Sequence, residues 1–106
     1  MRRDLGDFQT PPELAAALVA RLGPIGARWP RVLEPTCGRG AFLEAVCSAL
    51  APPREVVGVE IQSSHGTEAR ARLALLPSPT RSTILEADVF GLDLRTDPPW
   101  TEGGPL

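Results

Sequence analysis

The chain has 106 residues, enough for one small domain, and its 42% hydrophobic and 23% charged residues are typical of a globular protein. Its formal net charge of −2 differs from the basic charge of a domain that binds nucleic acid by itself. All 11 basic residues are arginine, which excludes a phosphate-binding GxxxxGK loop and a lysine Schiff base.

The few metal-ligating side chains argue against a metal site. Cys37, Cys47 and His65 do not have the spacing of zinc ligands, so no metal is expected. No apolar run follows residues 1–4, and no stretch approaches the ~18 apolar residues of a membrane span. We therefore expect a reduced, cytoplasmic chain with no membrane partner.

The first helix is expected after an extended lead-in over residues 1–9. Thr10-Pro11-Pro12-Glu13 predicts its start, with Thr10 as a hydroxyl cap, proline in the first turn and Glu13 three residues after the cap. Gly23-Pro24 ends the helix, and residues 23–30 are expected to form a turn-rich connector. Apolar side chains are expected on one face of the helix, which runs through Leu14, Ala17, Leu18, Arg21 and Leu22.

Three short strands are expected next, over residues 31–34, 55–60 and 82–86. A helix over residues 40–50 links the first two strands, and its buried side is expected to hold Phe42, Leu43, Val46 and Leu50. Another helix, capped by Ser63 or Ser64, is expected to run through Leu76 to Pro77. This alternation predicts an α/β fold with three parallel strands, flanking helices and right-handed crossovers.

The pattern fades from Gly91 onward, so residues 91–106 are expected to form a coil-like tail. Three strands make half of a usual doubly wound sheet. We therefore interpret residues 1–106 as a single partial domain with its core over residues 10–90, truncated where a fourth strand would begin. The first strand would then be an unpaired edge.

A glycine turn follows the first strand and is the most informative feature of the sequence. Gly38 and Gly40 let the backbone approach a ligand at the start of a helix, and Glu34 lies at the strand tip, where it can meet a hydroxyl or a positive charge. Leu43 stands where the third glycine of GxGxxG would fall, which disfavours a dinucleotide. The alternative is an ordinary turn between a strand and a helix.

Acidic residues also end the second and third strands. Glu60 ends the second strand 20 residues after Gly40, where a carboxylate reaches ribose hydroxyls. Asp88 follows the third strand, where an acceptor suits the amine of adenine. The alternatives are a solvated carboxylate at Glu60 and a turn-forming aspartate at Asp88.

Residues 34–43, Glu-Pro-Thr-Cys-Gly-Arg-Gly-Ala-Phe-Leu, resemble the cofactor motif of the adenine-N6 DNA methyltransferases of restriction–modification systems. Residues 8–13, Phe-Gln-Thr-Pro-Pro-Glu, are similar to the preceding motif of that family. The resemblance covers roughly residues 7–90. It implies the Rossmann-like fold of methyltransferases that use S-adenosylmethionine.

The resemblance also implies roles for individual residues. Phe8, Thr10 and Pro11 would border the methionine moiety of S-adenosylmethionine. Its amino and carboxylate groups would be held by Glu34, Cys37 and Gly38, with Gly40 allowing close approach. Glu60 would bind the ribose, and Asp88, Val89 and Phe90 the adenine. Cys37 can also be interpreted as a small buried hydrophobe, and no neighbouring base marks it as a nucleophile.

The catalytic motif of the family is Asn or Asp, two prolines and an aromatic residue, and Asp97-Pro98-Pro99-Trp100 matches its letters. In that family the polar residue holds the adenine amine, and the aromatic residue stacks on the flipped base. The match lies only nine residues after Asp88, which leaves no room for a helix and a fourth strand. The alternative is a proline-rich loop that mimics the motif.

We therefore expect the cofactor-binding part of a DNA adenine-N6 methyltransferase that is inactive as a fragment. It would contact DNA through regions missing from this chain and could pair with a catalytic or specificity subunit. The alternatives are an NAD- or FAD-binding half-domain, a non-catalytic accessory subunit, and a methyltransferase that acts on RNA, protein or a small molecule.

Overall fold

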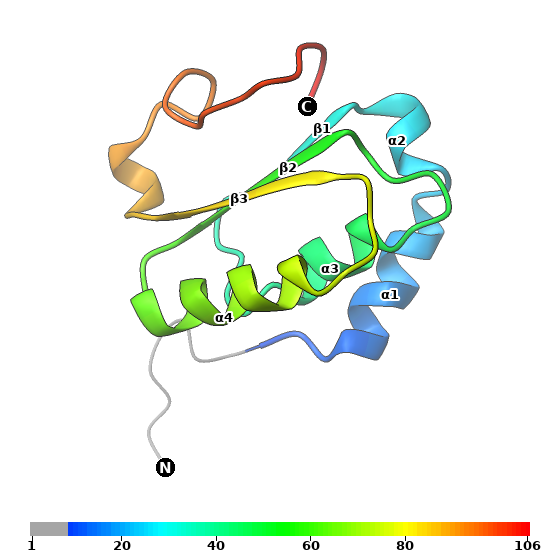
Figure 1. Ribbon diagram of the computed structural model, residues 1–106, viewed down its shortest axis with the longest axis horizontal. Helices are drawn as coiled ribbons and strands as arrows, with labels where there is room; N and C mark the ends of the chain where they lie inside the picture. The colour runs from blue at the N-terminus through cyan, green and yellow to red at the C-terminus, as the bar shows by residue number, and fades with distance from the viewer. Residues whose placement is uncertain (1–8) are drawn as a thin grey trace.

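The computed structural model describes residues 9–106, so Phe8 and the other residues before Gln9 lie outside it. Helices and strands alternate as the sequence predicts (Figure 1). The helices are α1 (Pro12–Arg21), α2 (Ile25–Arg28), α3 (Ala41–Cys47) and α4 (Ser63–Ala74). The strands are β1 (Arg31–Glu34), β2 (Glu55–Glu60) and β3 (Arg81–Glu86), and a 3-10 turn (Val89–Gly91) follows them.

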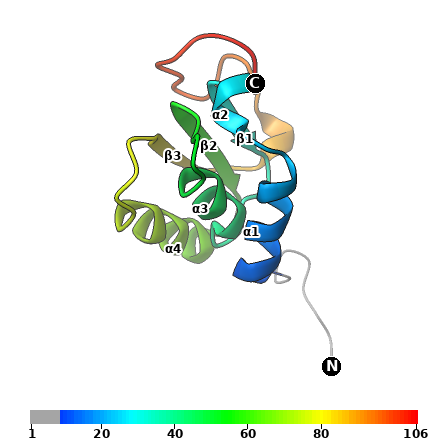
Figure 2. The same ribbon diagram turned by 90° about the vertical axis from the view of Figure 1, so that its right-hand side faces the viewer.

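The three strands form one parallel sheet in the order β1-β2-β3. Leu33 pairs with Val57, which in turn pairs with Thr83. Helices α1, α3 and α4 lie on one side of the sheet (Figures 1 and 2). This confirms the predicted α/β fold with three parallel strands and flanking helices, and it places the carboxyl ends of all three strands at one edge of the sheet.

The hydrophobic core lies between the sheet and these helices. Leu43 of α3, Val56 of β2 and Ile84 of β3 are its buried members at the centre. All six residues of β2 are buried, as expected for the middle strand of a sheet that is covered on both faces. Gly58 lies directly under α3, since a Cβ at this position would come 2.6 Å from Leu43 Cδ1 and 2.8 Å from Cys37 Sγ.

The leucines expected on the apolar face of α1 are not its buried residues. Ala15 and Val19 are the buried residues of this helix, whereas Leu14, Leu18 and Leu22 are 48%, 45% and 52% exposed. The helix packs against α3, and the small side chain of Ala15 lets the two helices approach closely. Leu18 and Leu22 line a groove beside β1, at the edge of the sheet that has no further strand within residues 9–106.

Both predicted serine or threonine caps were also wrong. The N-cap residue of α1 is Pro11, not Thr10, and that of α4 is Gln62, so that neither Ser63 nor Ser64 is the cap. Neither helix has a side-chain capping bond. The Ser63 hydroxyl instead donates to Glu86, 3.0 Å away on β3, because its position in the first turn faces the end of that strand.

The end of α3 and the connector before β1 also differ from the prediction. Helix α3 ends at Cys47, three residues early, so Leu50 lies beyond it and is fully exposed instead of buried. The connector expected over residues 23–30 contains the short helix α2, whose Ile25 is buried in the core. The backbone of Gly26 fits tightly against Pro52, since a Cβ there would lie 2.1 Å from the Pro52 carbonyl oxygen.

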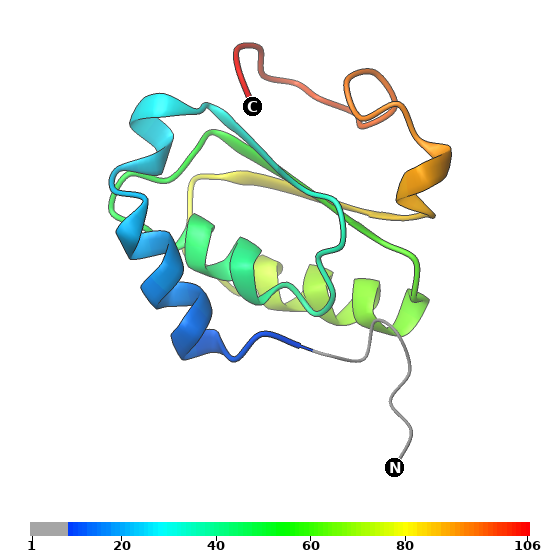
Figure 3. The same cartoon turned by 180° about the vertical axis from the view of Figure 1, so that it is seen from behind.

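The tail after the 3-10 turn has no helix or strand, as predicted, yet it packs against the sheet. It runs along the face opposite α3 and α4, back toward the start of β1 (Figures 1 and 3). Val57 and Val59 of β2, which alternate with the core-facing residues, are fully buried. The tail thus takes the place of a second layer of helices.

None of the helices within residues 9–106 is long and apolar enough to cross a membrane.

The close packing of Leu43 and Cys37 around Gly58 predicts that a larger residue at this position lowers stability. Gly58→Ala should lower the free energy of unfolding by about 1–3 kcal/mol, because the buried neighbours cannot move aside without strain. Urea denaturation followed by circular dichroism measures this change. Gly91→Ala is the matched control, since no atom lies within 4 Å of a Cβ at that position. Equal stability of the two variants would contradict the proposed contact.

Candidate functional site

The turn between β1 and α3 has the left-handed backbone that the two glycines permit. Gly38 has φ +56° and Gly40 has φ +91°, a region that other residues rarely adopt. The Cys37 N–H donates to the Val59 carbonyl at 2.9 Å, which ties the turn to β2. A Cβ on Gly40 would come 3.2 Å from Ala69 Cβ, so this glycine also lets α4 lie close to the turn.

Glu60 fastens this turn to the start of α4. Its Oε1 accepts from the Gly38 N–H and its Oε2 from the Gln62 N–H, both at 2.8 Å. The side chain is only 6% exposed, and these two charge-assisted bonds compensate for its burial. Each oxygen retains a second lone pair, so the carboxylate can still accept from a ligand.

Glu34, at the tip of β1, is in a different electrostatic situation. Its Oε1 is buried and has no hydrogen-bond partner among the described residues. This desolvation raises the pKa of the carboxyl group from 4.5 to about 7. A cationic ligand at this position would supply the missing partner and favour the ionised form.

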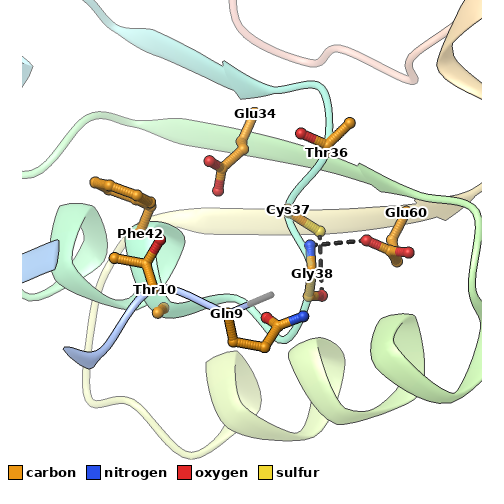
Figure 4. A pocket seen from close by; sticks show the side chains of 9 residues that line it. Gln9, Thr10, Glu34, Thr36, Cys37, Gly38, Phe42 and Glu60 are labelled. Atoms are coloured by element: carbon orange, nitrogen blue, oxygen red, sulfur yellow. Dashed lines mark hydrogen bonds between the residues drawn. The ribbon is translucent and has the colours of Figure 1, made fainter. Parts of the chain in front are cut away.

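Glu34 and Glu60 face one cavity of about 320 Å³ at the carboxyl end of β1 and β2 (Figure 4). Both acidic residues lie on its wall, and no Lys, Arg or His is among the described residues that line it. The lining residues are Gln9, Thr10, Glu34, Thr36, Cys37, Gly38, Ala41, Phe42 and Glu60. The cavity therefore has the charge that complements a cation and repels a phosphate.

Cys37 is a buried thiol in the wall of this cavity. Burial, with smaller effects of the charges on Glu34 and Glu60, raises its pKa to about 12. The thiol is therefore protonated near neutral pH, and its S–H donates to the Gly38 carbonyl at 3.7 Å. This agrees with a packing role and not with a nucleophile.

A second cavity, of about 340 Å³, lies at the carboxyl ends of β2 and β3. It shares Thr36 and Glu60 with the first cavity, so the two adjoin along the sheet edge. Asp88 Oδ1 accepts from the Phe90 N–H at 3.0 Å and caps the 3-10 turn, while the Phe90 ring is 95% exposed. The lining residues are Pro35, Thr36, Glu60, Ile61, Gln62, Ala87, Asp88, Val89 and Phe90.

The structure thus brings most of the predicted cofactor residues to one sheet edge. Thr10, Glu34, Cys37, Gly38 and Glu60 line the first cavity, and Glu60, Asp88, Val89 and Phe90 line the second. Pro11 and Gly40, the N-cap residues of α1 and α3, line neither cavity. Phe8 lies outside the described residues.

Sequence analysis missed several residues of the two cavities. Gln9 Oε1 accepts from the Arg39 N–H at 3.0 Å, and Thr36 lies at the junction of the two cavities. Phe42, assigned only to a buried helix face, lines the first cavity. Both Gln9 and Thr36 are inside the motifs that carried the resemblance, so their position was the available signal.

Asp97-Pro98-Pro99-Trp100 lines neither cavity. The Trp100 ring lies 4.9 Å from the guanidinium carbon of Arg31, the first residue of β1, whereas Glu34 is the last. The Thr101 N–H donates to Glu55, the first residue of β2. The end of the matched segment is therefore at the amino ends of the strands, away from the candidate site.

A comparison with curated proteins gives one significant match. The chain is 39% identical over 62 residues to Type II methyltransferase M.NspV of Nostoc sp.. The match covers 58% of this chain but only 13% of the length of the Nostoc protein. This is a relationship to a methyltransferase. No protein-family model matches the chain.

The raised pKa of Glu34 predicts that the stability of the chain depends on pH. Its folded value of about 7 exceeds the ordinary value of 4.5, so its contribution to stability is full below about pH 4.5 and is lost as pH rises through 7. The loss is at most about 3 kcal/mol, at about 1.4 kcal/mol per pKa unit. Urea denaturation between pH 5 and 8 measures it.

Glu34→Gln should flatten this pH dependence, because the amide cannot titrate. Glu13→Gln, on the exposed face of α1, should keep the profile of the unchanged chain. Parallel profiles for all three proteins would show that Glu34 titrates as an ordinary solvated carboxyl group.

Proposed function

We propose that the chain is the S-adenosylmethionine-binding part of a DNA adenine-N6 methyltransferase from a restriction–modification system. The relationship to a Type II methyltransferase supports the class of transferase. The motifs over residues 8–13 and 34–43 support the cofactor and the adenine-N6 target through their resemblance to that family. The observation that carries the cofactor assignment is the acidic cavity around Glu34.

The charge of this cavity fits S-adenosylmethionine. The cofactor carries a sulfonium and an ammonium group against one carboxylate, so its net charge is positive. Glu34 has a buried oxygen with no partner in the part of the chain that the structure describes, and an ammonium group supplies the donor and the charge that it lacks. We therefore assign the amino group of the cofactor to Glu34.

The other polar groups of the site suit the rest of the cofactor. Hydroxyl groups of Thr10 and Thr36 are donors for its carboxylate, and the free lone pairs of Glu60 are acceptors for the ribose hydroxyls. Because the Gly38 N–H already donates to Glu60, we assign Gly38 to providing space. Asp88, with Val89 and Phe90, would hold the adenine.

A dinucleotide fits this site less well. The pyrophosphate of NAD or FAD is negative and would meet two carboxylates without a basic residue among the described lining residues. A third helix glycine is replaced by Leu43, and the close approach of α3 to the sheet depends instead on Gly58 of β2. Both observations favour S-adenosylmethionine over the dinucleotide alternative.

The residues that hold the target base would come from another polypeptide segment. The bound cofactor would supply the methyl group, and the chain described here would bind and orient it. Asp97–Trp100 is outside both cavities, so we propose that DNA is contacted by regions beyond this part of the protein. A non-catalytic accessory subunit is the second candidate and fits the same observation. It predicts methyl transfer only after a catalytic chain is added.

Isothermal titration calorimetry with S-adenosylmethionine tests the cofactor assignment. Glu34→Gln and Glu60→Gln should each raise the Kd by roughly 10- to 100-fold, since each removes a charge-assisted hydrogen bond of about 1.5–3 kcal/mol. Glu13→Gln, which removes the same charge from the exposed face of α1, should leave the Kd unchanged.

Two further arms separate the alternatives. Affinity for S-adenosylmethionine should rise between pH 6 and pH 8 as Glu34 ionises, and Glu34→Gln should abolish this rise. NAD should neither bind nor raise the melting temperature. Binding of NAD with higher affinity than S-adenosylmethionine, or equal affinity of all three variants for S-adenosylmethionine, would overturn the proposal.

A further inference from the structure

Arg31 and Trp100 fasten the tail at the amino end of β1. The guanidinium group of Arg31 covers the Trp100 ring at 4.9 Å and donates twice to the Gly104 carbonyl, through Nε at 3.0 Å and Nη2 at 2.5 Å. A planar guanidinium can stack on a ring and donate in the same plane, which an ammonium cannot do. The hydrogen bonds join residues that are 73 positions apart.

Glu55 makes a second attachment next to the first. It is fully buried at the start of β2, and its carboxylate accepts from the Thr101 N–H at 2.9 Å and the Glu102 N–H at 2.9 Å. Burying a carboxylate is unfavourable unless donors are present. The tail backbone therefore satisfies Glu55, and Glu55 in turn holds the tail.

Asp97, Pro98 and Trp100 are used in local structure, whereas Pro99 is exposed. Asp97 Oδ2 accepts from the Asp93 N–H at 2.7 Å, and Pro98 is buried. The Trp100 N–H donates to the Pro98 carbonyl at 2.8 Å, and its indole Nε1–H donates to the Leu94 carbonyl at 3.3 Å. The segment is a compact turn that presents the indole ring to Arg31.

We propose that Arg31, Glu55, Trp100 and Gly104 form a latch that fastens residues 92–106 across the helix-free face of the sheet. The tail held by the latch runs along the face of the sheet opposite α3 and α4, where Val57 and Val59 of β2 are fully buried. The latch assigns Asp97–Trp100 a fastening role, although the four letters match a catalytic motif. Trp100 is thus a structural residue that does not contact cofactor or base.

Limited proteolysis tests the latch on the whole chain. Trp100→Leu removes the ring that Arg31 covers, so trypsin should cut after the exposed Arg95 roughly tenfold faster, while cleavage after Arg72 in α4 serves as the internal reference. Trp29→Leu is the control for the loss of an indole ring, because Trp29 packs against the hydrophobic core and stacks with Arg28, at 5.1 Å, instead of with Arg31. It should not raise the ratio of Arg95 to Arg72 cleavage.

Two further measurements cover the case in which Trp100→Leu does not fold. Arg31→Lys keeps the charge but loses the stacked double donor, and should also raise the cleavage ratio. In the unaltered chain, nuclear magnetic resonance should show Arg31 side-chain protons shifted upfield by the Trp100 ring current. Unshifted Arg31 protons, or cleavage ratios that neither substitution changes, would overturn the latch. Trp100 would then not be held by Arg31.

Discussion

The carboxylate of Glu60 connects the two loops on which the candidate site depends. It is buried at the end of the middle strand, and its oxygens bind the backbone of the glycine turn and the residue before α4. A buried carboxylate needs such donors, so the conformations of both loops depend on the hydrogen bonds of one side chain. The positive φ angles of Gly38 and Gly40 make this geometry accessible, and the close fit of Gly40 to Ala69 brings α4 up to the same turn. The shape of both cavities follows from this arrangement, because Glu60 lies in the wall that they share.

Glu34 and Glu60 differ in whether the described residues supply hydrogen-bond donors for their oxygens. Glu60 has protein partners for both oxygens, whereas Glu34 has a buried oxygen without a partner among residues 9–106 and a pKa raised to about 7. A buried acceptor without a donor is unfavourable, and this one lies at the wall of a cavity, which supports the proposal that Glu34 binds the ligand. Ionising Glu34 is unfavourable while its buried oxygen has no partner. A bound cation would remove this cost, which adds to the preference of the cavity for cations.

Local patterns in the sequence predicted those features of the fold that are determined by residues close together in the chain. The strands, the glycine turn and the acidic strand ends were predicted because short apolar runs and turn residues have meaning within a few positions. The buried face of α1 was not, since Ala15 and Val19 are chosen by the fit against α3 while the larger leucines have the stronger periodic signal. The latch could not be predicted from the sequence either, because Arg31 and Gly104 are far apart in the chain and no local pattern pairs them. The letters of Asp97–Trp100 matched a motif, but only the fold shows that Trp100 lies at the amino ends of the strands.

The tail covers one surface of this small sheet and leaves another open. On the helix-free face, Val57 and Val59 are fully buried beneath it, so the sheet does not need a second helical layer there. The outer edge of β1 has no such cover: all four of its residues are only half-buried, and a groove of about 210 Å³ along it is lined by Leu18, Leu22 and Val32 among others. An uncovered edge strand beside exposed leucines favours the addition of another strand.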